Sequence, residues 1–204
     1  VVAWHTHETV YGHAGFIAGA TGPFRPLWGM ILPMFFALSG FLVAGSLERS
    51  KSLIGFLGLR AIRIYPALIV EVVLSAFFLG LVFTTLPWDA YFRDPQFRAY
   101  LLNVTGDIHY RLPGVFLLNP FPAIVNAQLW TVPYELTCYV AVSILAALGI
   151  VKHRWISVVA TGSLCAVAAI WHLRYGLSVP VTIPIVGHGL VLRFLVVVTL
   201  YLYR

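Results

Sequence analysis

Charged residues, and acidic residues above all, are scarce in this chain. Asp, Glu, Lys and Arg make up 10% of the 204 residues, and only 7 residues are Asp or Glu. Soluble domains contain about 25% charged residues. The hydrophobic residue types make up 60% of the chain, so a water-soluble fold would have too few charges to cover its surface. The composition excludes a soluble globular domain and a disordered segment, and it indicates a protein that lies in lipid.

Cysteine is equally scarce. The chain has two cysteines, Cys138 and Cys165, and both lie within apolar runs. Two cysteines in such positions exclude a disulfide scaffold, and they show no spacing typical of metal ligands. We interpret both as small buried hydrophobic residues and expect no bound metal.

Positive charge exceeds negative charge. The 13 Lys and Arg residues outnumber the acidic residues and give a formal net charge of +6. In a soluble protein this balance would suggest nucleic acid as a partner. Here the cations lie mostly between apolar runs, where the positive-inside rule places them in membrane proteins. We therefore expect the lipid bilayer as a partner, and no nucleic acid.

Six apolar runs approach the length of about 20 residues that a helix needs to cross a bilayer. The run at residues 27–47 contains no charge. The sequence predicts an all-α, polytopic transmembrane helix bundle of about six helices. Because the chain begins and ends in apolar runs, we expect residues 1–204 to form a single membrane-embedded domain that is incomplete at both ends. The other five runs are residues 1–20, 66–86, 129–151, 155–172 and 185–203.

Lys and Arg gather in two connections between these runs, residues 48–63 and residues 152–154. The positive-inside rule places both on the cytoplasmic side of the cytoplasmic (inner or plasma) membrane, and the amino end with them. Residues 87–128 then lie on the outer side. A connection of that length is usually functional or contains a structural element of its own.

Ionisable residues inside apolar runs are costly in lipid, so each is a candidate functional residue. His5 and Glu8 are three residues apart and share one face of a helix. A carboxylate beside an imidazole orients the ring and stabilises its protonated form, as a general base requires. The alternative is a polar helix face that lines water or lies near the lipid headgroups.

Arg60 and Arg63 are also three residues apart, just before Pro66. Proline suits the first turn of a helix, so we expect both guanidinium groups at the cytoplasmic start of the run at residues 66–86. Two guanidinium forks fit the oxygens of a phosphate. The alternative is an anchor to lipid headgroups.

A stripe of small residues, Ala37, Gly40 and Ala44, recurs at helical spacing in the run at residues 27–47. Small residues let helix backbones approach closely in a membrane, so the pattern favours packing. Ser39 lies within this segment, and no neighbour in the sequence would make it a nucleophile.

Thr131 and Pro133 predict that a helix starts in the run at residues 129–151. Glu135 then lies in the first turn, where the helix dipole stabilises a carboxylate, so a capping role is one interpretation. Trp130 and Tyr134 are one turn apart and fit an aromatic belt at the membrane surface.

Taken in order, four segments resemble the acyltransferase-3 family of integral membrane O-acyltransferases, which includes O-antigen, peptidoglycan and exopolysaccharide acetyltransferases. Family members usually have about ten membrane helices, so the resemblance implies a bundle truncated from about ten. The family's first-helix arginine, eleven positions before its histidine, would precede residue 1. The four segments are Val1–His5, Phe35–Leu42, Arg60–Pro66 and Leu129–Tyr139, which resemble the family's first-helix histidine motif, its Phe-Phe-x-Leu-Ser-Gly-Phe-Leu, its arginine pair with proline and its Trp-Ser-Leu-x-x-Glu-x-x-x-Tyr.

The resemblance implies a membrane O-acyltransferase with an acyl-CoA donor, usually acetyl-CoA, and a hydroxyl acceptor on a carbohydrate or glycoside. On this reading the acceptor hydroxyl loses its proton to a general base and attacks the thioester. The site residues that it implies are His5, Glu8 and Glu135 for catalysis, Arg60, Arg63 and Ser39 for the donor, and Trp130, Tyr134 and Asn126 for the acceptor.

Two other readings stay open at this point. One is a transporter or flippase-like bundle, in which His5, Glu8, Glu71 and Arg193 form an intramembrane pathway. The other is a structural fragment without activity of its own.

Overall fold

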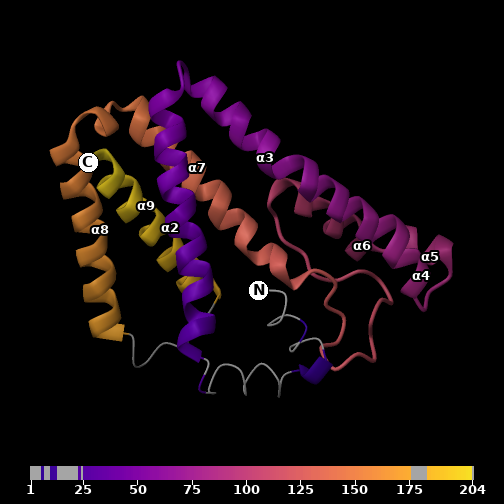
Figure 1. The fold of residues 1–204 in the computed structure, drawn as a ribbon. Helices are drawn as coiled ribbons and strands as arrows, with labels where there is room; N and C mark the ends of the chain where they lie inside the picture. Colours follow the sequence, from indigo (N-terminus) through magenta and orange to yellow (C-terminus); the bar gives the residue numbers. More distant parts are fainter. Residues whose placement is uncertain (1–5, 7–9, 13–22, 24, 176–182, 204) are drawn as a thin grey trace. The chain divides into compact units, whose positions relative to one another are not determined.

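The computed structural model describes residues 6, 10–12, 23, 25–175 and 183–203 (Figure 1). Over these residues every regular element is a helix, apart from an isolated β-bridge between Thr84 and Val115. The all-α prediction is confirmed. The elements are α2 (Arg25–Arg49), α3 (Leu53–Val73), the π-helix η1 (Leu74–Leu79), α4 (Gly80–Phe83), α5 (Trp88–Arg93), α6 (Pro95–Leu101), the 3₁₀-helices η2 (Leu102–Thr105), η3 (Ala127–Thr131) and η4 (Ile150–Lys152), α7 (Val132–Ala147), α8 (Arg154–Tyr175) and α9 (Ile183–Tyr203).

Four of the described helical stretches are long and apolar enough to cross a membrane, and they support a multi-pass membrane protein. A fifth apolar stretch, Trp155–Trp171, is shorter. Five of the six predicted runs therefore coincide with helices, and most of the predicted run at residues 1–20 lies outside the described residues. The four long stretches are Gly29–Arg49, Leu53–Phe83, Ala127–Ala147 and Val186–Tyr203.

The predicted connection at residues 48–63 is wrong over most of its length. Helix α3 begins at Leu53, so Arg60 and Arg63 lie within it, and Pro66 is inside the helix, not in its first turn. Two effects explain the difference. Arg carries an apolar stem that extends along a helix, and membrane helices tolerate proline where neighbouring groups satisfy the freed backbone carbonyl. The start of α7 at Val132, with Pro133 in its first turn, agrees with the prediction.

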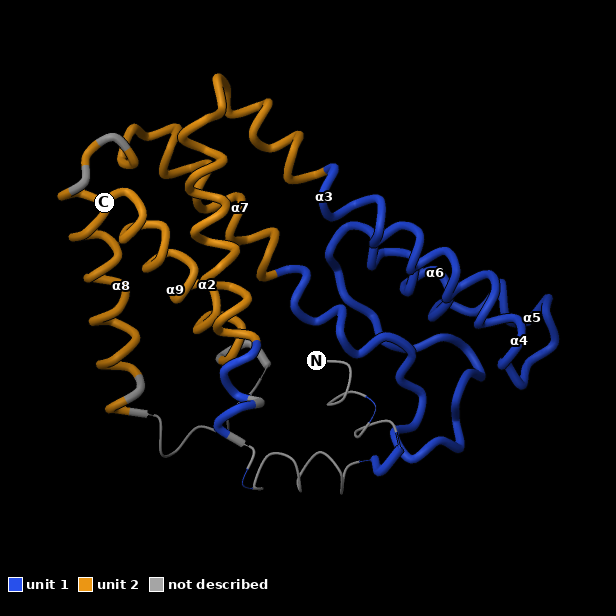
Figure 2. The backbone as a smooth tube through the Cα atoms, viewed as in Figure 1, with its two compact units in different colours: residues 1–31, 62–133 blue, residues 32–61, 134–204 orange. Residues whose placement is uncertain are grey.

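The chain divides into two compact units (Figure 2). Unit 1 comprises residues 1–31 and 62–133, and unit 2 comprises residues 32–61 and 134–204. Helices α2, α3 and α7 each continue from one unit into the other.

Close contacts between small residues and a neighbouring helix hold unit 2 together. A Cβ atom added at Gly40 of α2 would lie 2.7 Å from the backbone oxygen of Phe194 in α9. Five residues along α2, a Cβ at Gly45 would lie 2.9 Å from the hydroxyl oxygen of Tyr201. At Gly40 only glycine permits the approach, because the neighbouring atom belongs to the backbone, so the packing role predicted for the small-residue stripe is confirmed there.

The turn that follows α2 and the turn that precedes α8 lie at one end of unit 2 (Figure 1). The hydroxyl of Tyr201 donates to a carboxylate oxygen of Glu48 at 2.9 Å, which joins the ends of α9 and α2. The ring of Trp155, at the start of α8, packs edge-on against Tyr203 with centroids 5.8 Å apart. The two basic segments around residues 48–52 and 150–154 therefore share an end of unit 2, as the predicted common side requires.

Unit 1 has an aromatic and aliphatic core built largely from the long connection. Helices α5 and α6 lie within residues 87–128, so the predicted additional element is present. The fully buried Tyr91 of α5 donates its hydroxyl to the backbone oxygen of Ala76 in η1 at 2.7 Å. A Cβ at Gly80 would overlap this hydroxyl group, so the tyrosine depends on that glycine. The core residues are Leu68, Val72, Ala76, Tyr91, Phe97, Tyr100, Leu112, Val115 and Leu129.

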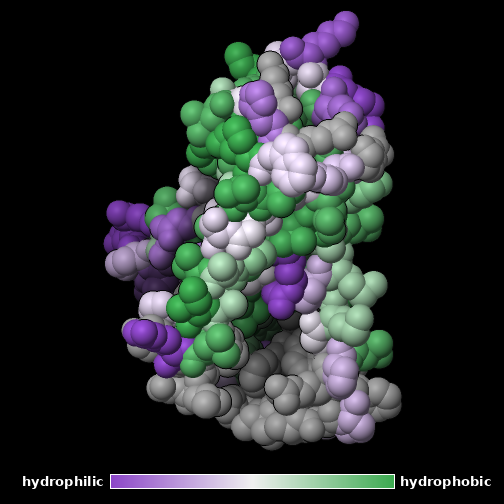
Figure 3. All heavy atoms as spheres, turned by 90° about the vertical axis from the view of Figure 1, so that its left-hand side faces the viewer, coloured by the Kyte–Doolittle hydropathy of each residue, from purple (hydrophilic) through white to green (hydrophobic). Residues whose placement is uncertain are grey.

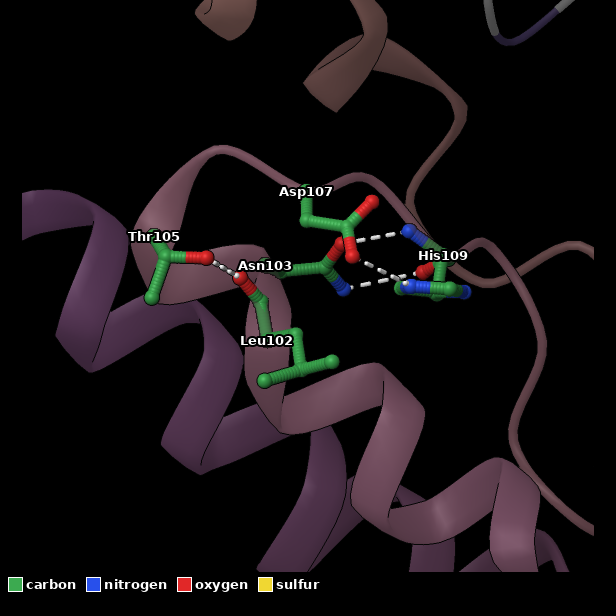
Figure 4. Close-up of polar contacts among 5 residues, drawn as sticks. All are labelled: Leu102, Asn103, Thr105, Asp107 and His109. Atoms are coloured by element: carbon green, nitrogen blue, oxygen red, sulfur yellow. Dashed lines mark hydrogen bonds and ion pairs between the residues drawn. The ribbon is translucent and has the colours of Figure 1, made fainter.

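A side-chain clamp closes the turn after α6 (Figure 4). The buried amide of Asn103 accepts from the backbone nitrogen of His109 at 2.6 Å and donates to its backbone oxygen at 2.9 Å. Asp107 lies 3.2 Å from Nε2 of the same histidine. Because Asn103 satisfies both backbone groups of one residue, it fixes the direction in which the chain leaves α6.

Large apolar side chains are exposed along the described helices. The face seen in Figure 3 is mostly apolar over its described residues. On α8, Trp155, Val159, Val167 and Leu173 are all exposed, and Leu173 exposes 84% of its surface. An apolar surface of this extent is unusual for a soluble monomer and fits contact with lipid.

We predict that Gly40→Ala lowers the stability of the protein, because the new methyl group would meet a backbone oxygen that cannot move independently. Overpacking of this kind typically costs about 1–3 kcal/mol. Thermal unfolding in detergent micelles, followed by circular dichroism, measures the effect. Gly162→Ala in α8 is the matched control, because no atom lies within 4 Å of its added Cβ. Equal midpoints for the two variants would contradict the close packing of α2 on α9.

We also predict an alkaline loss of stability that depends on Tyr91. Burial raises the pKa of this tyrosine from 10.0 to about 12, and the nearby Tyr100 adds to the increase. Above pH 10 the unfolded chain releases a proton that the folded protein keeps. The stabilisation is therefore complete below pH 10 and is lost as the pH rises to about 12.

The Tyr91→Phe variant should show a smaller decrease of the unfolding midpoint between pH 10 and 12 than the parent protein. At pH 8 it should be less stable by about 1 kcal/mol, because the backbone oxygen of Ala76 loses its donor. Tyr65→Phe, which removes a hydroxyl that has no hydrogen bond in the described structure, should keep the parent profile. An unchanged alkaline profile in Tyr91→Phe would contradict the assignment.

Candidate functional site

Arg60 lies about two turns after the start of α3 and is half-buried in unit 2. Its Nη2 donates to the hydroxyl oxygen of Ser46 in α2 at 3.0 Å. The guanidinium carbon lies 5.8 Å from the ring centroid of Phe56 and 5.9 Å from that of Tyr139. Two aromatic faces and one hydroxyl group therefore hold this cation.

The charge of Arg60 is not neutralised by the described part of the protein. No described carboxylate lies within ion-pair distance of it, and its Nε is buried without a hydrogen-bond partner there. A half-buried guanidinium with an unused N–H donor is costly unless an anion completes its contacts. The arrangement therefore suits an anionic ligand.

Glu135 lies close to the same group of side chains. The buried Tyr139 donates its hydroxyl to a carboxylate oxygen of Glu135 at 2.5 Å, one turn back along α7. The ring of Tyr139 thus contacts Arg60 while its hydroxyl contacts Glu135. We call Ser46, Phe56, Arg60, Glu135 and Tyr139 the Arg60 cluster. It brings together two residues that the sequence predicted for the site, Arg60 and Glu135.

Ser39 lies on the same face of α2 as Ser46, seven residues or about 10 Å earlier. It is 3% exposed, and its hydroxyl has no partner in the described part of the chain. Serine in a helix commonly returns its hydrogen bond to the preceding turn. The hydroxyl of Ser39 is thus a buried polar group that makes no hydrogen bond to the described residues.

The remaining predicted residues are more widely distributed. Arg63 is exposed, one turn after Arg60 on α3, and Trp130 is half-buried in η3. The ring of Tyr134 lies against Gly187 of α9 and meets the ring of His188 edge-on at 5.9 Å. His5 and Glu8 lie outside the described residues.

Asn126 belongs to a hydrogen-bond network in unit 1. Its amide nitrogen donates to the hydroxyl oxygens of Ser75 and Tyr100, both at 2.8 Å. The amide nitrogen of Gln128 donates to Glu71 at 2.6 Å and contacts the amide oxygen of Asn126 at 3.4 Å. Burial raises the pKa of Tyr100, the hydrogen bonds with Ser75 and Asn126 lower it, and the charge of Glu71 raises it.

The sequence did not reveal Gln128 or Ser46 as partners of charged residues. Gln128 is 57 positions from Glu71, and Ser46 is 14 positions from Arg60. The polar character of Ser46 in an apolar run was the one signal that pointed to it. Among the described residues, no group of three or more His, Cys, Asp or Glu side chains is placed to hold a metal ion.

The fold and the Arg60 cluster define a multi-pass helical membrane protein with a half-buried cation that suits an anion. The chain matches the sequence model of an acyltransferase domain over residues 1–203 and belongs to the acyltransferase-3 family. It is also 30% identical over 125 residues to a protein of Shigella phage Sf6 described as "O-acetyl transferase". The aligned region covers 61% of this chain and 36% of that relative. No solved structure matches the chain.

We predict that Tyr139→Phe destabilises unit 2 through Glu135 and leaves the ring under Arg60 in place. A half-buried carboxylate that loses its donor should cost about 1–3 kcal/mol. Thermal unfolding in micelles measures this loss. Tyr203→Phe, at an exposed tyrosine that keeps its ring contact with Trp155, is the control. Equal midpoints for the two variants would show that the bond to Glu135 contributes nothing to the folded state.

Proposed function

We propose that the protein of which this chain is part is a membrane O-acyltransferase that moves an acetyl group from acetyl-CoA to a hydroxyl of a carbohydrate or glycoside. Membership of the acyltransferase-3 family supports an acyl transfer, and the similarity to a phage O-acetyl transferase supports an acetyl group. The observation that carries the proposal is the half-buried Arg60 without an ion-pair partner in the described structure.

Arg60 is proposed to bind a phosphate group of CoA. Its buried Nε–H and the N–H groups that Ser46 does not use form one side of a planar fork, which matches two phosphate oxygens. Arg63 lies on the next turn of α3 and adds a second cation to the same helix face. Ser39, whose hydroxyl has no partner among the described residues, is proposed as a third residue that contacts the acyl-CoA donor.

The chemistry is proposed to be a direct attack on the thioester. His5, oriented by Glu8, removes the proton of the acceptor hydroxyl, and the alcohol oxygen forms a bond to the acetyl carbon. The bond between carbon and sulfur then breaks, and CoA leaves as the thiolate. Glu135, held by Tyr139, is proposed as a catalytic carboxylate, and Trp130 and Tyr134 are each proposed as an aromatic surface for a sugar.

The donor is proposed to arrive from the cytoplasm. Arg49 and Lys51 lie at the end of unit 2 where α2 passes into α3. The positive-inside rule assigns this end to the cytoplasmic side of an inner or plasma membrane, where acetyl-CoA is present. On this assignment the amino end of the chain is cytoplasmic as well.

We predict that Arg60→Ala raises the KM for acetyl-CoA about ten- to a hundredfold, since one charge-assisted contact is worth about 1.5–3 kcal/mol. Arg60→Lys should restore only part of the affinity, because an ammonium group lacks the fork. The assay supplies labelled acetyl-CoA to membranes that contain the full-length protein and detects the acetyl ester by mass spectrometry. Arg98→Ala, at an exposed arginine of α6, is the control. An unchanged KM for acetyl-CoA in Arg60→Ala would contradict the proposal and favour an anchor to lipid headgroups.

We predict that His5→Ala lowers kcat by roughly 10²–10⁴-fold, the usual contribution of a general base. Binding of acetyl-CoA should persist. His7→Ala should do much less, because two residues that are two positions apart do not share a helix face. Normal turnover of His5→Ala with loss in His7→Ala would move the base to the second histidine. Solute flux into proteoliposomes without ester formation would favour the transporter reading.

A further inference from the structure

Glu71 is the acidic residue that the fold places inside the long apolar stretch Leu53–Phe83. A carboxylate in such a stretch is costly and is usually retained for a function. Its partner in unit 1 is Gln128, whose amide nitrogen donates to it at 2.6 Å. We call Glu71, Ser75, Tyr100, Asn126 and Gln128 the Asn126 network.

The inner part of the Asn126 network is fixed by buried groups. Tyr100 is fully buried on α6 and Ser75 is 7% exposed on the π-helix η1. Each accepts one of the two amide hydrogens of Asn126, at 2.8 Å. The amide of Asn126 therefore has a single orientation, with its nitrogen directed inward and its oxygen toward Gln128. Such a rigid base is what a binding site needs to hold its outer groups in place.

The outer part of the network offers hydrogen-bond acceptors and no free donor. The amide nitrogen of Gln128 is engaged by Glu71 and by the oxygen of Asn126. The amide oxygen of Gln128 and the second carboxylate oxygen of Glu71 have no partner in the described part of the chain. Gln128 is exposed, and Glu71 and Asn126 are half-buried, so these oxygens are accessible.

An accessible surface with this composition selects its ligand by chemistry. A ligand must supply hydrogen-bond donors, because the oxygens that Glu71 and Gln128 leave unused are acceptors. The negative charge of Glu71 repels phosphates and carboxylates, so the CoA phosphates do not suit it. Neighbouring hydroxyl groups of a neutral sugar have the required donors and carry no charge.

We propose that Glu71 and Gln128 bind the hydroxyl groups of a neutral carbohydrate acceptor, and that Asn126, Ser75 and Tyr100 position them. This inference rests on the proposed O-acyltransferase function. It assigns to Glu71 a contact with the acceptor. Glu71 is not proposed to contact acetyl-CoA. A change at Glu71 should therefore alter the KM for the acceptor and leave the KM for acetyl-CoA unchanged.

The Glu71→Gln variant separates this role from a structural one. The new amide oxygen still accepts from Gln128, so the network keeps its internal bond, while the outer oxygen is replaced by an N–H donor. Asp89→Asn is the matched control, because it removes the same charge from an exposed carboxylate of unit 1. Gln128→Met, which removes the second proposed acceptor oxygen at similar length, tests the other half of the site.

The experiment measures acetyl transfer from acetyl-CoA to methyl glucoside by the full-length protein in nanodiscs, with methyl glucuronide as the anionic analogue. In Glu71→Gln the KM for methyl glucoside should rise roughly ten- to a hundredfold, as expected for loss of a hydrogen bond to a charged group. The KM for acetyl-CoA should stay unchanged. The preference for the neutral glycoside over the glucuronide should decrease, because the repulsive charge is gone.

The outcomes distinguish the two levels of the proposal. A wild-type protein that forms no ester with either glycoside or with cell-envelope glycan overturns the proposed function, and the inference with it. An active wild-type protein with unchanged glycoside KM values in both Glu71→Gln and Gln128→Met overturns the inference alone. Equal changes of the glycoside KM in Glu71→Gln and Asp89→Asn would show an effect of general surface charge. This result would also overturn the inference.

Discussion

Hydrocarbon offers no hydrogen bonds, and this constraint decides where the polar groups of the protein lie. Arg60 is inside an apolar helix, so its partners come from neighbouring helices: the hydroxyl of Ser46 and the rings of Phe56 and Tyr139. Tyr139 in turn satisfies Glu135. The Arg60 cluster is therefore both the solution to a solvation problem and the place where α2, α3 and α7 are joined by polar contacts.

The same constraint produces two kinds of packing in the two units. Unit 2 consists of long helices, and in lipid the hydrophobic effect does not drive helices together. Their contact therefore depends on small residues such as Gly40, which lets the backbone of Phe194 approach closely. Unit 1 includes the long connection, and its core is aromatic. There Tyr91 reaches from α5 to a backbone oxygen of the π-helix, where the regular pairing of the helix is interrupted.

Much of the fold follows from the sequence, because long apolar runs have few alternatives to helices. The run at residues 27–47 and the start of α7 are examples. The sequence predicts a connection at Arg60, because a charge usually ends a membrane run, whereas its partners allow it to lie inside α3. Glu71 was recognised as an ionisable residue in an apolar run, but its partner Gln128 was not. Pairing over 57 positions leaves no local pattern, so only the fold reveals it.

The Arg60 cluster and the Asn126 network differ in chemistry, and the difference bears on the two substrates of the proposed function. Within the described residues, the Arg60 cluster offers a cation without an ion-pair partner and an unused N–H donor, so it favours an anion. The Asn126 network offers a carboxylate and amide oxygens, so it rejects an anion and favours hydroxyl groups. A transferase with a charged donor and a neutral acceptor needs this distinction, because each substrate is then repelled or left unpaired at the other's site. In the proposed function, the opposite chemistry of the two groups would select each substrate by its charge.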